Sequence, residues 1–245
     1  MNVAMLGATR GTGRELARLL SLRGDRLVLL GRSHVELDRS ARDLISRGAV
    51  NRVETVACDL NDQASHEPAL SRAEAILGRI DAVVVTAAMF AMQDHLDRDP
   101  LLLTKLLQTD FTDTILFCEA ARKRLLASGG GTLCVFSSVA GDRGRKPVLL
   151  YGAAKAGLSA YLEGLDHAYR RQGLRVICVK PGFIRTTATA ALTPPPFAAN
   201  PEDVARVVLR GIDSGRPVVY APPVWRWIML VIRTLPRFVM RRVGF

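Results

Sequence analysis

The alternation of short apolar runs with longer helical segments is the feature of this sequence that most constrains its fold. The runs are nearly continuous in Val, Ile, Leu and Ala, which is typical of strands covered on both faces. Strands are expected at 2–7, 26–31, 52–58, 81–88, 131–138, 174–182 and 216–221. Helical segments between them lie at 13–23, 33–48, 65–77, 100–127 and 151–172. This order predicts an α/β fold, a Rossmann-type doubly wound parallel sheet of about seven strands with helices on both faces.

The length and composition indicate one domain. A chain of 245 residues suits a single α/β domain, and no linker or repeat divides it. We expect the domain to span 1–223 and a C-terminal appendage to span 224–245. The last helix of the domain should begin with Asn200 as N-cap and Pro201 at the first helical position. The N-terminus enters a strand directly, so no signal peptide is expected. The four cysteines lie in or beside apolar runs without metal-binding spacing, which indicates buried thiols, no metal site and a cytoplasmic protein.

The net charge of +11 is concentrated at the C-terminal end of the chain. From Arg216 onward there are six arginines and no Asp or Glu. A nucleic-acid-binding protein usually spreads its basic surface over the fold and carries a recognisable reading module. Neither is present, so nucleic acid is not an expected partner.

A glycine-rich turn, "GATRGTG", follows the first expected strand. Gly7, Gly11 and Gly13 allow the backbone to approach a pyrophosphate closely, and the next helix directs its N–H groups and dipole at the phosphates. Thr9 and Thr12 lie in the same turn. These residues predict a dinucleotide-binding site.

The GxxxGxG spacing of this turn resembles the short-chain dehydrogenase/reductase family. The stretch "SSVAGDRGRKPVLLYGAAK" extends the resemblance, because Ser138, Tyr151 and Lys155 match the serine, tyrosine and lysine of that family at its usual spacing. Tyr151 and Lys155 share one helix face, and Ser138 closes a strand at the carboxyl edge of the sheet. The resemblance implies hydride transfer between a nicotinamide and a ketone or secondary alcohol.

The chemistry of carbonyl reduction explains these residue types. A free tyrosine has a pKa of about 10, and a neighbouring ammonium stabilises the tyrosinate and lowers that pKa. Tyr151 is therefore the expected general acid in reduction and general base in oxidation. Ser138 is expected to donate a hydrogen bond to the substrate oxygen. By resemblance, Lys155 also holds the nicotinamide ribose hydroxyls.

Two arginines bear on the choice between NADP(H) and NAD(H). The second strand ends without the acid that would bind a ribose 2′-hydroxyl. Instead, Arg32 follows Gly31, and Arg10 lies in the glycine turn. Two guanidinium groups can grip a 2′-phosphate, and in the resembling family basic residues at these places mark NADP-preferring members. The sequence therefore favours NADP(H).

The resemblance implies further cofactor contacts. Asp59, followed by Leu60, matches the residue that contacts the adenine. The segment "TAAM" at 86–89, with Ala87 and Ala88, lies where the family usually has Asn-Asn-Ala-Gly, so that motif is only partly kept. The segment "KPGFIRTT" matches a Pro-Gly segment that meets the nicotinamide. Its expected contacts are Pro181, Gly182, Ile184 and Thr186. The following stretch, 187–200, is expected to be either a mobile substrate lid or an ordinary surface loop.

Asp110 departs from the family pattern, because alignment places it where a catalytic asparagine is common. In the resembling enzymes that asparagine helps to hold a proton-relaying water. A carboxylate would partly offset the effect of Lys155 on Tyr151, or it would be protonated if buried. The alternative is a helix residue with no role.

The C-terminal segment "VWRWIMLVIRTLPRFVMRR" predicts an amphipathic helix with a kink near Pro236. Its longest uninterrupted apolar run, 227–232, has six residues, fewer than the ~20 needed to span a bilayer. Arginines on one side and tryptophans at one end suit an anionic membrane surface, here the inner face of the cell membrane. Packing on the chain's own core, on a second subunit in a homo-oligomer, or on an acidic partner remains an alternative.

This segment and "RGRKPVLLYGAAKAGL" also resemble decaprenylphosphoryl-2-keto-erythro-pentose reductases. That resemblance implies a keto sugar carried on a polyprenyl phosphate. The alternatives are a soluble reductase of a small ketone or secondary metabolite, with the C-terminal segment at a subunit interface, and a non-catalytic NADP-sensing protein. Only the departure at Asp110 supports the last.

Overall fold

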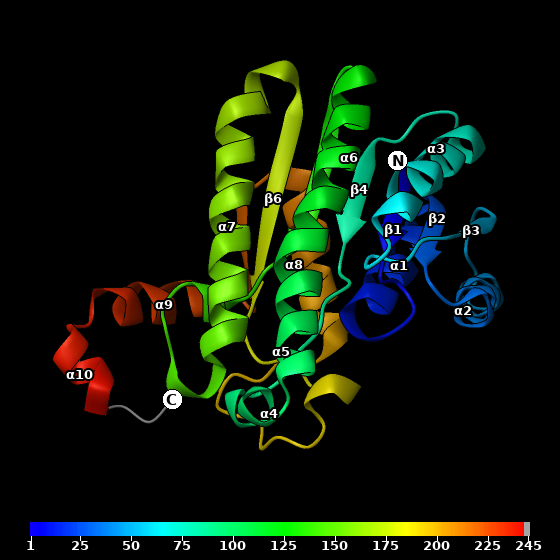
Figure 1. Cartoon of the computed structure of the whole chain (residues 1–245). Coiled ribbons are helices and arrows are strands. Elements are labelled where there is room, and N and C mark those ends of the chain that lie inside the picture. The colour runs from blue at the N-terminus through cyan, green and yellow to red at the C-terminus, as the bar shows by residue number, and fades with distance from the viewer. Residues whose placement is uncertain (243–245) are drawn as a thin grey trace.

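The computed structural model describes residues 1–242 and contains one seven-stranded parallel sheet. The strand order is β3-β2-β1-β4-β5-β6-β7, so the direction of winding reverses between β1 and β4 (Figure 1). The strands are β1 (Asn2–Leu6), β2 (Arg26–Gly31), β3 (Val53–Ala57), β4 (Ala82–Val85), β5 (Gly131–Phe136), β6 (Leu174–Pro181) and β7 (Val218–Ala221). The doubly wound fold expected from the sequence is confirmed, and each strand lies within its expected range.

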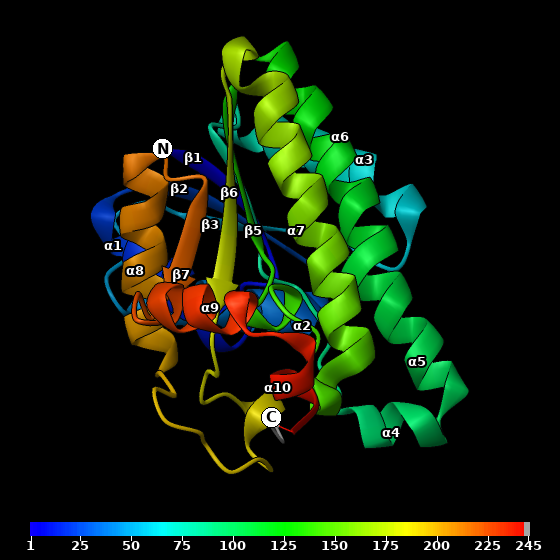
Figure 2. The same cartoon turned by 90° about the vertical axis from the view of Figure 1, so that its left-hand side faces the viewer.

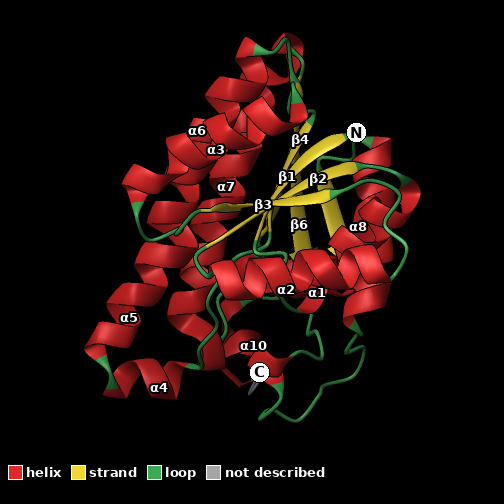
Figure 3. Ribbon diagram, turned by 90° about the vertical axis from the view of Figure 1, so that its right-hand side faces the viewer, coloured by secondary structure: helices red, strands yellow, loops and turns green. Residues whose placement is uncertain are grey.

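Two helical layers cover the sheet (Figures 2 and 3). One layer contains α1 (Gly11–Arg23), α2 (His34–Ser46) and α8 (Pro201–Ser214). The other contains α3 (His66–Leu77), α6 (Thr114–Ala127) and α7 (Leu149–Tyr169). Each layer buries an apolar cluster against one face of the strands. This double burial explains why the strands are almost continuous in aliphatic residues.

The prediction of one continuous helix over 100–127 is wrong in detail, because the segment is divided into three parts. It consists of α5 (Pro100–Leu107), a π-helical turn (Gln108–Asp113) and α6. A short helix, α4 (Gln93–Arg98), precedes it and was not expected. A π turn inserts an extra residue into a helix and often occurs at functional sites. Here it carries Asp110.

Pro201 occupies the first turn of α8, as expected, but Asn200 does not cap that helix with its side chain. The Asn200 side-chain oxygen accepts a hydrogen bond from Arg185 instead, at 3.4 Å. The tertiary contact between the 185–200 loop and the helix end therefore replaces the local cap. Ile184, just before that loop, forms a bridge with Ala199.

The C-terminal segment forms α9 (Trp225–Thr234) and α10 (Arg237–Arg242), with the expected interruption at Pro236. α9 lies across the carboxyl ends of β6 and β7 (Figure 2). Its side chains Trp225, Met229 and Ile232 are buried with Val139 in a small apolar cluster. Residues 243–245 of the expected appendage lie outside the described residues. Over residues 1–242, no helix is both long and apolar enough to cross a bilayer.

Candidate active site

The glycine turn fills the space between the carboxyl ends of β1 and β4. Gly7 has a φ of 97°, in the left-handed region that favours glycine. A Cβ atom at Gly7 would clash with the backbone of Ala87, and one at Gly13 would clash with the carbonyl of Gly7. Thr86 closes the junction, since its hydroxyl donates to the Gly7 carbonyl at 2.9 Å. Gly7 and Gly13 are thus required by packing. At Gly11, by contrast, a Cβ atom would lie 3.4 Å from the side chain of Thr186, which is an ordinary contact distance.

The N-terminus of α1 is suited to an anion. Arg10, the N-cap residue, makes no side-chain capping bond, and the first turn holds no acid. The hydroxyl of Thr12 in that turn is buried without a hydrogen-bond partner within the described residues. Free N–H groups and the helix dipole both favour negative charge at this position. The unpartnered hydroxyl and the close-packed glycines therefore fit the pyrophosphate of a dinucleotide.

Arg10 of the glycine turn and Arg32 after β2 line the same cavity, together with Glu36 of α2. Arg10 is largely exposed and lies 3.8 Å from the carboxylate of Glu36. Sequence reasoning missed Glu36, although an acid in the first turn of the helix after β2 indicates this position. Asp59 follows β3, and its carboxylate accepts a hydrogen bond from the backbone of Asn61 at 3.0 Å.

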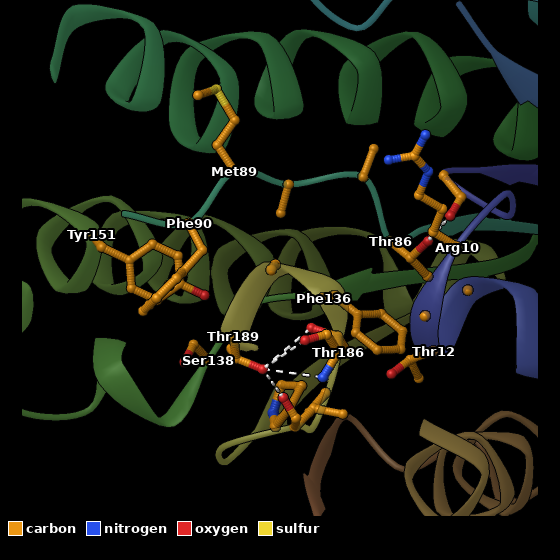
Figure 4. Close-up of a pocket in the computed structure, with 18 of the residues that line it drawn as sticks. Arg10, Thr12, Thr86, Met89, Phe90, Phe136, Ser138, Tyr151, Thr186 and Thr189 are labelled. Atoms are coloured by element: carbon orange, nitrogen blue, oxygen red, sulfur yellow. Dashed lines mark hydrogen bonds between the residues drawn. The ribbon is translucent and has the colours of Figure 1, made fainter. Parts of the chain in front are cut away.

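Ser138, Tyr151 and Lys155 line the cavity at the carboxyl end of β5, and Figure 4 shows Ser138 and Tyr151 on the same side of it. The Lys155 ammonium is buried and lies 5.6 Å from the centre of the Tyr151 ring. Phe90 packs edge-on against that ring, with centroids 5.1 Å apart. The Ser138 hydroxyl accepts a hydrogen bond from the backbone of Ala140 at 3.1 Å, which fixes its position. The three side chains thus form one cluster on the cavity wall.

The pKa of Tyr151 is raised above its ordinary value. Burial is the main cause, and the ammonium of Lys155 lowers the pKa by a smaller amount. The sign of the Lys155 effect agrees with the sequence-based expectation, but the net direction is opposite because burial outweighs it. The carboxylate of Asp110 raises the pKa of Tyr151 further, as expected from its negative charge.

Asp110 lies behind the cluster, fully buried, and does not line the cavity. One carboxylate oxygen, Oδ2, lies 3.3 Å from Lys155 Nζ, and the other, Oδ1, accepts a hydrogen bond from Met89 N–H at 2.6 Å. Burial raises the pKa of Asp110, although Lys155 opposes this. Burial also disfavours the charged form of Lys155, but its charged neighbours, Asp110 first, raise its pKa overall. Lys155 is therefore held in its charged form.

One cavity of about 1290 Å³ connects these parts. It is lined by every residue expected to contact the cofactor or substrate except Asp110. They are Gly7, Thr9, Arg10, Gly11, Thr12, Gly13, Arg32, Asp59, Leu60, Ala87, Ala88, Ser138, Tyr151, Lys155, Pro181, Gly182, Ile184 and Thr186. In Figure 4, Arg10 and Thr12 lie at one end, and Ser138, Phe90 and Tyr151 lie at the other.

The lining also includes residues that the sequence did not indicate, among them Arg145 and Trp225. Trp225 comes from α9 and packs directly on Gly182, where any Cβ atom would clash with the indole. The tryptophan was visible in the sequence, but only the fold brings the C-terminal segment to the segment after β6.

A sequence profile of the short chain dehydrogenase family matches residues 1–196. The chain belongs to this family. An uncharacterized oxidoreductase of Mycobacterium tuberculosis is 34% identical over 241 residues, which are 98% of this chain and 96% of the relative. Carbonyl reductase family member 4 of Danio rerio is 29% identical over 195 residues, 77% of each chain. The crystal structure of a variant actinorhodin polyketide ketoreductase with NADPH is similar in fold, with a TM-score of 0.80 and 22% identity. The match covers 89% of this chain and 95% of the ketoreductase chain. This short chain dehydrogenase is accordingly an NAD(P)-dependent oxidoreductase.

Proposed function

We propose that the protein is an NADPH-dependent carbonyl reductase. The observation that carries the proposal is the position of Tyr151, with Lys155 and Ser138, in the same cavity as the glycine turn. A bound nicotinamide would supply hydride to the carbonyl carbon. Tyr151 gives its hydroxyl proton to the oxygen that becomes an alcohol, and Ser138 donates a hydrogen bond to that oxygen. Lys155 stabilises the tyrosinate that remains, and Asp110 positions Lys155.

Replacement of Tyr151 by Phe tests this assignment. The Tyr151→Phe protein should bind NADPH as the wild type does, because the hydroxyl is the only group removed. Its turnover of any ketone should fall by about 10²–10⁴-fold, the usual contribution of a general acid. NADPH fluorescence measures binding, and NADPH oxidation measures turnover. Ketone reduction at the wild-type rate would contradict the proposal.

The preference for NADPH over NADH rests on Arg10 and Arg32. Each can pair with a 2′-phosphate, and Glu36 would repel it, so the arginines must outweigh that carboxylate. Replacing either arginine by Gln should reduce kcat/KM for NADPH by about tenfold or more and leave NADH nearly unchanged. Arg39→Gln, an exposed change on α2 outside the cavity, is the matched control. Equal losses with both cofactors would refute the preference.

We further propose that the substrate is a keto sugar on a polyprenyl phosphate, reduced at an anionic membrane surface. The exposed side of the C-terminal helices supports a surface role. Trp227, Leu230, Val231 and Phe238 are each more than half exposed, and exposed arginines such as Arg226 accompany them. Aromatic and aliphatic residues flanked by arginines suit the interface of an anionic bilayer. The same helix reaches the cavity through Trp225.

A soluble reductase of a small ketone or secondary metabolite is the second candidate. The burial of Trp225, Met229 and Ile232 against the domain favours it, because α9 packs on the fold itself. Removing the whole appendage cannot separate the two candidates cleanly, since it would uncover Gly182 and the cavity.

Substitutions confined to the exposed side of the C-terminal helices do separate them. The variant Trp227→Ser/Leu230→Ser/Phe238→Ser should float less than the wild type on phosphatidylglycerol-containing liposomes at low salt. Both proteins should reduce a water-soluble ketone equally. Flotation on neutral liposomes is the control for charge. If neither protein floats, the membrane proposal fails and the soluble candidate stands.

A further inference from the structure

The loop between Ser138 and Tyr151 holds its polar side chains in defined contacts. Asp142 accepts hydrogen bonds from Lys180 at 2.6 Å and from the hydroxyl of Tyr220 at 2.7 Å. Arg143 donates to the Leu235 carbonyl at 2.7 Å. Lys146 also donates to the C-terminal helices, at the carbonyl of residue 241. The loop is therefore fixed on one side by β6 and β7 and on another by the C-terminal helices.

Arg145 is the exception in this loop. It lines the cavity, and its Nε is buried without an acceptor within the described residues. No carboxylate in residues 1–242 forms an ion pair with it. Burial lowers the pKa of its guanidinium. A partly desolvated cation without a counter-ion is unfavourable, and an arriving anion would remove that cost.

The charges around the cavity are segregated. The carboxylates that line it, Glu36 and Asp59, follow β2 and β3 at the end of the cavity that holds Arg10. Arg145 lies in the loop between Ser138 and Tyr151, and the exposed Lys105 of α5 also lines the cavity. Within residues 1–242, no acid lines the end that holds Ser138 and Tyr151, because Asp110 is behind Lys155 and paired with it. The part of the catalytic end that the structure describes thus offers Arg145 to a ligand, with no opposing carboxylate.

We propose that Arg145 binds an anionic group, a phosphate or a carboxylate, that the ketone substrate carries near its reacting carbonyl. The inference rests on the proposed reductase function and names the chemical class of its substrate. A guanidinium can bind either group through two parallel hydrogen bonds. The hydrogen bonds of Arg143 and Lys146 hold the backbone on both sides of Arg145, so the C-terminal helices position this residue.

Matched pairs of ketones test the assignment. One pair is dihydroxyacetone phosphate and dihydroxyacetone, and the other is 4-oxopentanoate and its methyl ester. With wild-type enzyme and NADPH, at least one anionic ketone should be preferred to its neutral partner. Arg145→Gln should lower kcat/KM for the preferred anion by about ten- to a hundredfold and leave the neutral ketones within about twofold. Arg145→Lys should retain part of the preference.

Arg226→Gln is the matched control, because Arg226 is exposed on α9, next to Trp225, and does not line the cavity. It should leave both pairs unchanged. Unfolding temperature and NADPH binding show whether Arg145→Gln is folded. Equal losses for anionic and neutral ketones in Arg145→Gln, or no preference for either anion in the wild type, would overturn the proposal.

Calorimetry distinguishes failure of this inference from failure of the proposed function. The enzyme is first saturated with NADP⁺, so that phosphate cannot bind at the glycine turn. Dihydroxyacetone phosphate or 4-oxopentanoate is then titrated into the wild type and into Arg145→Gln. The ketone that binds the wild type more tightly identifies the preferred anion. Binding that Arg145→Gln loses, without turnover of any ketone, would support the anion site and refute the reductase. Ketone reduction without any anion binding would refute the site alone.

Discussion

Replacing Asp110 by Asn tests whether Lys155 is held by a buried ion pair. The two oxygens of Asp110 serve two donors, the Lys155 ammonium at 3.3 Å and the Met89 N–H at 2.6 Å. An asparagine side chain has one acceptor oxygen and directs its amide hydrogens at the other donor. The variant therefore leaves either the backbone N–H without an acceptor or the ammonium with only the Phe136 carbonyl, at 3.5 Å.

The geometry gives the size of the effect. Unit charges separated by 3.3 Å attract by about 5 kcal/mol at an effective dielectric constant of ~20. Removing one member of a buried pair typically costs about 3–5 kcal/mol, since the other charge stays buried. For a chain of 245 residues, this corresponds to a fall in Tm of roughly 6–20 °C at pH 7. Thermal unfolding followed by circular dichroism measures it.

The pH dependence of the stability difference is the sharper test. In the wild type, burial disfavours the charged form of Lys155 but Asp110 raises its pKa overall, so the stabilisation is complete below the unfolded pKa and is lost as the pH rises from there through the raised value. In Asp110→Asn, burial acts without the carboxylate, so the pKa of Lys155 falls below its unfolded value. The variant should then gain stability as Lys155 loses its proton, and the Tm deficit should shrink between pH 7 and 10.

Asp113→Asn is the matched control for this prediction. Asp113 lies in the same π turn, is buried, and accepts hydrogen bonds from the amides of Asn61, Gln63 and Gln108. It pairs with no cation within the described residues. Its replacement should lower Tm by an amount that does not change between pH 7 and 10. An unchanged Tm in Asp110→Asn, or a deficit that stays constant over this range, would refute the ion-pair reasoning.

Three further predictions follow from packing and burial. Gly13→Ala should prevent NADPH binding and lower Tm, because the new methyl group would clash with the Gly7 carbonyl; unfolding with and without NADPH measures both. Asp142→Ala should cost about 3 kcal/mol in urea unfolding, since it removes the partner of Lys180 and the acceptor for Tyr220. The four cysteines are buried, and burial raises their thiol pKa values. A disulfide reagent at pH 8 should therefore label none of them in the native protein and all four in urea, and absorbance measures the number labelled.

The sheet and the glycine turn could be predicted because local pattern determines them. Apolar runs bounded by turns fix the strands, and the packing around Gly7 and Gly13 leaves no room for other side chains. Ser138, Tyr151 and Lys155 were predicted to act together because they match the family's serine, tyrosine and lysine at its usual spacing, and all three line one cavity in the structure.

The π turn could not be predicted, because its cause lies outside its own sequence. Asp110 reaches both Lys155 on α7 and the backbone of Met89 after β4, contacts that only the tertiary structure creates. Arg145 was missed for a similar reason. It is an ordinary charged residue in sequence, and its meaning comes from the cavity that it lines.

The two sides of the C-terminal helices bear on two separate proposals. Membrane binding and core packing are alternatives in the sequence, but α9 is apolar on two sides. Trp225 and Met229 face the domain, while Trp227 and Leu230 face solvent. The buried side completes the cavity at Gly182, and the backbone of these helices holds the loop that carries Arg145. Because the two sides do not overlap, the proposed surface binding and the proposed anion recognition should be separable by substitution, and a variant that loses one should keep the other.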